Sequence, residues 1–388
     1  MGTATQIERH GVADEVDRKL NELLDHARAQ PGVNHAILAI ERLDQTFRWV
    51  GATGDAHPDG PPMSLDTPYW IASVTKLYIA ASTFKLIEQN ALHLRTPVTE
   101  LLPAAMIDSL HRHKGVDYSD LITVQHLLGH SSGLPDYLEE SSKGTTPLLD
   151  AIAENDRAWT IDDAVRIVRE DLVPHFPPQD LDARRQKIRY SDTNYQLLIQ
   201  ILEHIHERSL ADVFERDFYT PLALTSTGHP GQHGLNHSPA TVWAGATALD
   251  RPNAMRSFRD LVSTVDDQVR FMRALATGGL FERTDTIYRM MGNWNSFPFS
   301  LNPMPKSPVW PISYGLGAMR LAIPRVFTPF TPIPSAMGHT GVSGSWLFYC
   351  PDLEVVVAGT VDQFEAAAFP FRFLPRLIST LQDTLKRN

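Results

Sequence analysis

Residues 70–94 read WIASVTKLYIAASTFKLIEQNALHL, and apolar side chains recur along this stretch at helical spacing. The pattern predicts a long buried helix with Ser73 in its first turn. Residues 73–76 are Ser-Val-Thr-Lys, and a separation of three residues places the Ser73 hydroxyl and the Lys76 amine on one helical face. The stretch therefore predicts both a core helix and two polar side chains that reach each other.

The chemistry of this pair is that of a serine nucleophile. A serine hydroxyl reacts poorly until a neighbouring base takes its proton, and a partly buried lysine serves because desolvation lowers its pKa. At the start of a helix, the backbone N–H of Ser73 is also placed to stabilise an oxyanion. Ser82 and Lys85 repeat the spacing, but nine residues rotate Ser82 about half a turn away from Ser73, so we interpret Ser82 as structural.

A second segment, residues 188–195 (IRYSDTNY), precedes an apolar pattern that predicts a helix. Tyr190 thus lies at a loop-to-helix junction, where a side chain can face a cleft. A phenol titrates near about 10, and a nearby lysine cation favours the phenolate, so Tyr190 is a candidate proton shuttle. Taken alone, Tyr190 fits a packed aromatic residue better than a catalytic one.

A third segment, residues 338–346 (GHTGVSGSW), is a glycine-rich entry into a predicted hairpin. An edge strand of this kind holds substrate by main-chain hydrogen bonds, and the N–H of Val342 is a candidate second oxyanion donor. His339, Thr340 and Gly341 are the candidate substrate-binding residues on this strand.

The rest of the chain gives an organisation around these segments. An amphipathic helix is expected near the N-terminus, through Val12, Val16, Leu20, Leu23 and Leu24. One hairpin is predicted within residues 34–50, and a second is predicted from residues 345–349 paired with residues 353–361. A helix is predicted over residues 374–385. Residues 95–250 show helical patterns and Pro- and Asp-rich loops, and residues 327–334 predict a loop.

Composition excludes several classes of protein. The chain has 388 residues, 43% hydrophobic and 21% charged, as an ordinary globular protein has. With 45 acidic and 35 basic residues and no long basic run, nucleic acid is not an expected partner. Cys350 is the only cysteine, so neither an internal disulfide nor a cysteine zinc site is expected, and no metal or cofactor is predicted.

Neither a secretory signal nor an apolar run of membrane-spanning length is visible. We therefore expect a cytoplasmic protein, or a periplasmic or secreted one if a signal peptide has been removed. The oligomeric state is not readable from the sequence.

In order and context, the three segments resemble the serine β-lactamase and penicillin-binding-protein superfamily, especially its class C β-lactamase, DD-peptidase and family VIII esterase branch. The resemblance runs from about residue 32 to 363. It includes residues 127–135 (LLGHSSGLP), 218–222 (FYTPL), 261–264 (LVST) and 314–317 (YGLG).

The resemblance implies an α+β fold of the β-lactamase/transpeptidase type, with an antiparallel sheet flanked by helices beside an all-helical lobe. We expect one catalytic domain over residues 1–388, with an α/β lobe at about 1–80 and 251–388 and a helical lobe at about 81–250. By the same resemblance, Ser73 matches the acylated serine, Lys76 its lysine, Tyr190 the tyrosine of the Tyr-x-Asn motif, and residues 339–341 the Lys-Thr-Gly motif.

Two departures from the family pattern bear on specificity. Asp192 stands where the family usually has Asn, and an ionised Asp accepts but does not donate hydrogen bonds, repels a carboxylate-bearing substrate and holds Lys76 protonated. His339 replaces the usual Lys and loses its charge near neutral pH. We therefore expect a small ester, amide or short peptide substrate (carboxylesterase or D-amino-acid peptidase-like activity), with weak or no β-lactamase activity.

Alternative interpretations remain open at this point. A true class C-type β-lactamase, a non-catalytic penicillin-binding-like protein, and a register with residues 191–193 as the Ser-Asp-Asn motif all use the same segments. Residues 129–133 (GHSSG) also fit the nucleophile elbow of an α/β-hydrolase with Ser131 as nucleophile, although residues 123–128 predict a helix where an elbow needs a strand. His111 with His113, and His204 with His206, are interpreted as surface or packing residues.

Overall fold

An eight-stranded antiparallel sheet forms the base of the molecule. The computed structural model describes residues 12–142, 144–231, 238–299 and 308–385. In sheet order, the strands are β2 (Arg48–Gly54), β1 (His35–Arg42), β14 (Val355–Thr360), β13 (Trp346–Cys350), β12 (Ala336–Thr340), β11 (Met319–Leu321), β10 (Ile312–Tyr314) and β9 (Asn295–Ser296). The two predicted hairpins are confirmed as β1–β2 and β13–β14.

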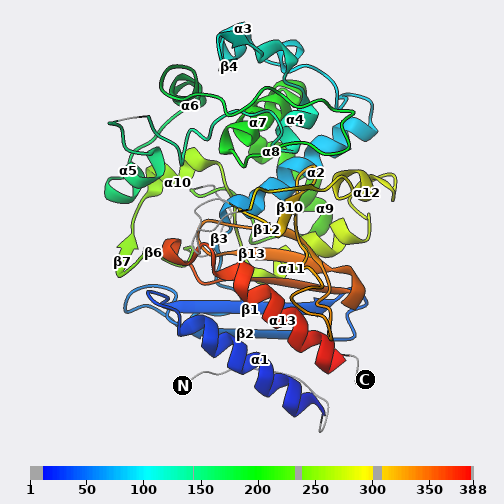
Figure 1. Cartoon of the computed structure of the whole chain (residues 1–388). Coiled ribbons are helices and arrows are strands. Elements are labelled where there is room, and N and C mark those ends of the chain that lie inside the picture. The colour runs from blue at the N-terminus through cyan, green and yellow to red at the C-terminus, as the bar shows by residue number, and fades with distance from the viewer. Residues whose placement is uncertain (1–11, 143, 232–237, 300–307, 386–388) are drawn as a thin grey trace.

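The strand residues alternate between two hydrophobic cores, as the period of two in a strand requires. In β1, Ala36, Leu38 and Ile40 join one core with the apolar sides of α1 (Val12–Arg28) and α13 (Phe369–Leu385). Ile37 and Ala39 join the opposite core, which contains α11 (Val265–Ala276) and the helices beyond it. Helices thus cover both faces of the sheet, and Figure 1 shows α1 and α13 side by side on one of them.

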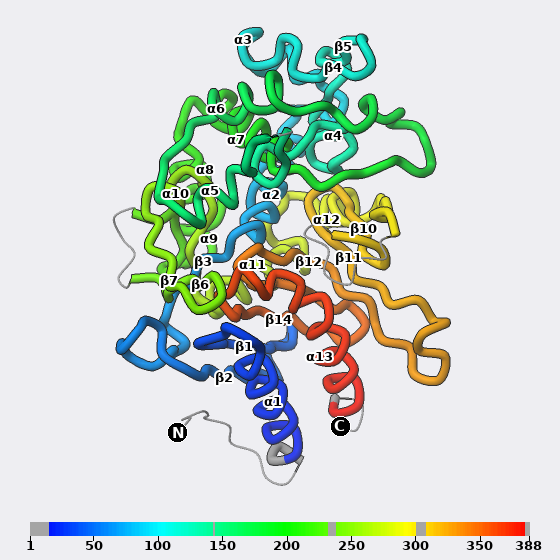
Figure 2. The backbone as a smooth tube through the Cα atoms, turned by 60° about the vertical axis from the view of Figure 1, so that its left-hand side comes forward, coloured from blue at the N-terminus to red at the C-terminus, as the bar shows by residue number. Residues whose placement is uncertain are grey.

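Helices and short strands make up the part of the molecule away from α1 and α13 (Figures 1 and 2). The remaining helices are α2 (Thr75–Glu88), α3 (Ala104–Ile107), α4 (Val124–Leu128), α5 (Leu148–Glu154), α6 (Ile161–Arg166), α7 (Asp192–His206), α8 (Leu210–Phe214), α9 (Thr220–Leu222), α10 (Pro252–Phe258) and α12 (Thr286–Met290). Three two-stranded sheets pair β3 (Tyr69–Trp70) with β8 (Val262–Ser263), β4 (Arg112–His113) with β5 (Val116–Asp117), and β6 (Val242–Ala244) with β7 (Thr247–Leu249).

The expected fold class, an antiparallel sheet flanked by helices beside a helical region, is confirmed. The division into lobes at residues 80 and 250 stays a prediction. The expected extent of the helix at 70–94 is wrong at both ends. Trp70 is extended because it pairs with Val262, and the helix stops at Glu88, beyond which Asn90 takes a left-handed conformation with φ of 56°. The C-terminal helix begins at Phe369, five residues before the predicted start.

α2 runs through the centre of this arrangement, and twelve of its fourteen residues are buried. An apolar surface all around a helix is typical of a helix enclosed on every side. Among the residues that the structure describes, no helix combines the length and apolar character needed to cross a membrane.

Candidate active site

Ser73 lies in a tight turn at the entrance to α2. Residues 72–74 form a single 3₁₀ turn between β3 and α2, and Ala72, directly before Ser73, is held in the left-handed region at φ 46°. A non-glycine residue in this region is strained and persists only where its surroundings fix it. The hydroxyls of Ser343 and Ser345 do so by donating to the carbonyls of Trp70 (3.1 Å) and Ile71 (2.8 Å).

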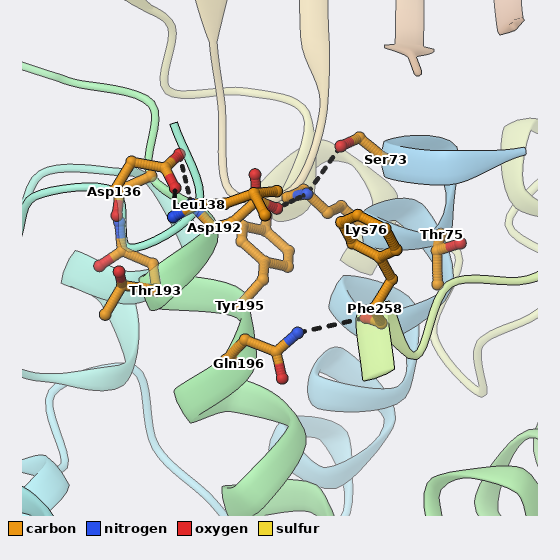
Figure 3. A network of polar contacts seen from close by, with 12 residues as sticks. Ser73, Thr75, Lys76, Asp136, Leu138, Asp192, Thr193, Tyr195, Gln196 and Phe258 are labelled. Atoms are coloured by element: carbon orange, nitrogen blue, oxygen red, sulfur yellow. Dashed lines mark hydrogen bonds and ion pairs between the residues drawn. The ribbon is translucent and has the colours of Figure 1, made fainter. Parts of the chain in front are cut away.

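Lys76 follows Ser73 by one turn, as predicted, and its side chain is only 3% exposed. The Nζ of Lys76 donates to the Ser73 Oγ at 2.9 Å and also to Oδ1 of Asp192, the first residue of α7. Figure 3 shows the ammonium lying between the serine and the carboxylate. Burial is the largest single effect and lowers the pKa of Lys76, but the charge and hydrogen bond of Asp192, together with Tyr190 and Asp260, outweigh it and hold the pKa well above its usual range.

The expectation that desolvation makes Lys76 a free base is therefore wrong for the resting site. The expectation that Asp192 holds Lys76 protonated is confirmed in direction. Asp192 is itself held by the side chain of Asp136, because the backbone N–H of Asp192 donates to Oδ2 of Asp136 at 3.0 Å. Oδ1 of Asp136 accepts from the backbone N–H of Leu138 at 2.9 Å.

Tyr190 lies directly against this pair, two residues before α7. Its ring centroid is 5.2 Å from the Lys76 Nζ, and the residue is 8% exposed. Burial raises the pKa of the Tyr190 phenol well above its usual range, although the charge of Lys76 and interactions with the Ser73 and Lys76 side chains act in the opposite direction. The expected preference for phenolate is therefore wrong for the resting site, and the phenol keeps its proton.

Residues 339–342 lie at the end of β12 and directly after it, and three of the four reach the cavity. Thr340, Gly341 and Val342 line the same cavity as Ser73. His339 is fully buried and does not line that cavity; its Nδ1 donates to the Thr340 carbonyl at 2.7 Å, and its Nε2 lies 3.1 Å from the Tyr314 hydroxyl.

His339 is consequently not a titratable cation for substrate. Burial, together with the charge of Lys76, lowers its pKa to about 3. The imidazole is neutral across the physiological range, which corrects the expectation for its place in the Lys-Thr-Gly motif.

A cavity of about 360 Å³ opens over the Ser73 hydroxyl. Its polar lining includes Ser73, Lys76, Tyr190, Asp192 and Asp260, and its apolar walls include Leu138, Leu149, Phe258, Trp310 and Phe371. A larger cavity of about 1020 Å³ shares six lining residues with it, among them Leu149, Phe258 and Val342. The two spaces therefore adjoin beside the end of β12.

The α/β-hydrolase interpretation of Ser131 is wrong. The preceding residues 124–128 form α4 rather than a strand, and Ser131 is fully buried and does not line the cavity. Two of the histidines interpreted as packing residues contact backbone carbonyls of a distant segment: His111 Nε2 lies 3.0 Å from the Phe176 carbonyl and His113 Nδ1 lies 2.7 Å from that of Pro174.

Comparison with known proteins places this geometry in a family. The family model described as Beta-lactamase matches residues 18–373. The chain belongs to the Beta-lactamase family. This membership, expected from the sequence, makes it a β-lactamase-related serine hydrolase.

Individual members of the family are only distantly similar. A curated relative, Penicillin-binding protein 4 of Amycolatopsis lactamdurans, is 26% identical over 65% of this chain, and the match spans 62% of that relative's own length. D-amino acid amidase of Ochrobactrum anthropi SV3 superposes with a TM-score of 0.71 at 20% identity, over 96% of this chain and 99% of the other. EstCE1, a hydrolase with promiscuous acyltransferase activity, gives 0.74 at 20% identity with the same coverage. At this identity the structures establish the fold.

Two acidic residues of the site were not identified as site residues from the sequence. Asp136 follows the LLGHSSGLP stretch, and Asp260 directly precedes LVST, so each adjoins a segment that resembled the family. A carboxylate beside a buried apolar run is the signal that points to them, since such a group is rarely buried without a partner.

Proposed function

We propose that the chain hydrolyses ester or amide substrates through an acyl-enzyme formed on Ser73, as a carboxylesterase or D-amino-acid peptidase-like enzyme. The observation that carries the proposal is the 2.9 Å contact between the Ser73 hydroxyl and the Lys76 ammonium at the floor of a cavity. Tyr190 and Asp192 complete the proton-handling groups around the serine.

The proton of Ser73 needs an acceptor, and Lys76 and Tyr190 both carry protons in the resting site. We infer a relay in which Lys76 passes one proton to the Asp192 carboxylate while it takes the proton of Ser73. The Ser73 Oγ then bonds to the acyl carbon, and the leaving group departs with a proton supplied by Tyr190 or Lys76. In deacylation, water attacks the acyl-enzyme ester and gives a proton to the relay. The relay returns a proton to the Ser73 Oγ as its bond to the acyl carbon breaks, and the acid is released.

In this proposal, two backbone N–H groups stabilise the oxyanion that develops on the substrate carbonyl. The N–H of Ser73 lies in the pinned 3₁₀ turn, and the N–H of Val342 follows β12 on the cavity wall. Because both belong to the backbone of fixed elements, they need no reorganisation as charge develops.

The walls favour apolar acyl groups over a carboxylate-bearing β-lactam. The Asp192 carboxylate faces the cavity, and neutral His339 supplies no cation in place of the family lysine. The names of two structural relatives, D-amino acid amidase and EstCE1, support amide and ester chemistry for this fold. Arg372 favours the alternative, a class C-type β-lactamase, because this exposed cation on the cavity rim is able to meet a substrate carboxylate.

A substrate panel tests the proposal. Short-chain p-nitrophenyl esters, D-amino-acid amides, D-alanyl peptides and a chromogenic cephalosporin are compared with wild-type protein and Ser73→Ala. We expect turnover of esters or amides above that of the cephalosporin and a loss of about 10³-fold or more in kcat for Ser73→Ala. Ser82→Ala and Ser131→Ala are matched controls that stay within about tenfold. Labelling of Ser73→Ala by an acylating probe, seen in the intact mass, refutes the assignment.

A further inference from the structure

Asp260 lies on a segment that is fastened to the entrance of α2. Beyond the β3–β8 pairing, the Ile71 N–H donates to the Leu261 carbonyl at 3.0 Å. The Leu261 N–H donates in turn to Oγ1 of Thr75 at 2.9 Å. Residue 260 is therefore held beside the turn that carries Ser73 and the first residues of α2, which include Lys76.

The Asp260 side chain lines the cavity together with Ser73 and Lys76. Burial raises the pKa of its carboxyl to about 7, against the lowering effects of the Lys76 charge and of a hydrogen bond from Thr75. Reciprocally, the Asp260 charge contributes to the raised pKa of Lys76. Thr75 thus links the two sides, since its oxygen accepts from Leu261 while its hydroxyl interacts with Asp260.

Two carboxylates, Asp192 from α7 and Asp260 from the segment before β8, therefore act on one ammonium. The other groups around it are neutral rings, and burial lowers the pKa values of His130 and His339 and raises that of Tyr195 to values that keep all three uncharged near neutral pH. The full set of groups around Lys76 is Ser73, Tyr190, Asp192, Tyr195, Asp260, His130 and His339, with Asp136 behind Asp192.

We propose that Asp260 is a positioning residue for the acylation step, acting through Lys76 to hold the ammonium near Ser73 and to set the pH at which the serine becomes reactive. The inference rests on the proposed function of Ser73 and Lys76. Asp192 alone draws the ammonium toward α7, whereas Asp260 supplies a second attraction from the wall beside α2. Removing it has two consequences: the Lys76 relay gives up a proton more readily, and the ammonium is held less firmly near the serine.

The test is the pH profile of kcat/KM for a p-nitrophenyl ester with Asp260→Asn. Because Asp260 ionises at about pH 7, wild-type protein gains this negative charge beside Lys76 only on the acidic limb. Asp260→Asn has no such ionisation, so the acidic limb moves to lower pH, by about one unit, and kcat at the plateau falls several-fold because the ammonium is held less firmly. Asp260→Ser, a smaller side chain, gives the same shift, whereas Asp260→Glu keeps the charge and leaves the limb within about 0.3 units of wild type. Asp267→Asn is the control, because that buried carboxylate bonds Ser226 and Thr227 and does not line the cavity; its limb stays in place.

An acidic limb that stays at its wild-type pH in both folded charge-removing variants overturns the proposal. Folding is checked by circular dichroism and the melting temperature, and if Asp260→Asn does not fold, Asp260→Ser decides. Failure of the underlying function is seen separately, because wild-type protein then fails to be acylated at Ser73 by an active-site probe. Acylation at Ser73 together with an unmoved limb removes Asp260 alone.

Discussion

At the scale of single residues, the Asp192 carboxylate decides how the site treats charge. It accepts from Lys76 and faces the cavity, where the family's Asn would donate an amide hydrogen to a substrate carbonyl. We predict that Asp192→Asn raises the rate of cephalosporin hydrolysis relative to ester hydrolysis, because a substrate carboxylate no longer meets a negative group. Steady-state kcat/KM values for both substrates measure the ratio.

The ratio separates specificity from general damage to the relay. Loss of Asp192 as proton acceptor lowers both rates, so only their quotient reports on the substrate charge. Asp150→Asn, on the wall of the larger adjoining cavity alone, is the control and leaves the quotient unchanged. A quotient that stays constant or falls in Asp192→Asn removes the electrostatic argument.

Tyr190 and Lys76 belong to one proton-handling unit, which predicts non-additive losses. Tyr190→Phe keeps the ring and deletes the phenol, so the free energy of unfolding changes by no more than about 1–2 kcal/mol while kcat falls about 10²-fold or more. Lys76→Ala is at least as damaging. The double variant is little worse than the worse single one, because the two residues serve the same step.

Single-turnover kinetics on the four proteins check this prediction. Losses that multiply would assign the residues to separate steps. A Tyr190→Phe protein with near-wild-type kcat and pH profile identifies Tyr190 as a packed aromatic residue.

The spacing of Ser73 and Lys76 in the chain was sufficient to predict their contact, since one helical turn relates them. The protonation state of Lys76 was predictable only in part, because the sequence pointed to Asp192 but not to Asp260. It depends on Asp192 and Asp260, which are 116 and 184 residues from Lys76 in the chain and reach it only through tertiary packing. For the same reason, no feature of the sequence indicated that His339 faces away from the cavity.

At the scale of elements, the junction between β3, α2 and β8 positions the serine. The buried hydroxyl of Thr75 accepts the Leu261 N–H at 2.9 Å and so joins α2 to the segment that carries Asp260. We predict that Thr75→Val lowers the free energy of unfolding by about 1–3 kcal/mol, since it leaves a buried N–H without its acceptor in a side chain of the same shape.

Chemical denaturation compares Thr75→Val with Thr75→Ser, which keeps the oxygen and loses one methyl group. We expect Thr75→Ser to be clearly the more stable of the two. Equal stabilities would show that the hydroxyl adds nothing to the junction and that its methyl group alone matters.

Elements that a local sequence pattern determines were predicted well. Elements that depend on pairing with a distant part of the chain were not. The β-like runs located both hairpins to within a few residues. Each pair of runs is separated by turn residues, and these are visible in the sequence even where a strand is buried on both faces. Trp70 carries the same apolar signal as the helix that follows it, so its pairing with Val262, nearly 200 residues later, was invisible to periodicity. Trp70 was accordingly assigned to the helix although it belongs to β3.

At the scale of the whole molecule, the buried histidines make stability depend on pH. His339 and His130 are fully buried, and burial, with the charge of Lys76, lowers the pKa of His339 to about 3 and that of His130 well below its usual value. In the unfolded chain both side chains titrate near about 6.5. The unfolded state therefore binds protons below that pH while the folded state does not.

This sign predicts that the free energy of unfolding is highest above about pH 6.5 and falls as the pH drops toward 3, by up to about 1.4 kcal/mol per pH unit for each such histidine. Urea denaturation at pH 7.5, 6.5, 5.5 and 4.5 measures the slope. His339→Gln removes one titrating group, so the slope flattens by about that amount even if the variant is less stable at every pH. His93→Gln, which alters an exposed histidine, keeps the wild-type slope. A His339→Gln slope equal to that of wild type would contradict this prediction. It would mean that His339 takes up protons in the folded state as readily as in the unfolded chain, although its imidazole is fully buried beside the Lys76 ammonium.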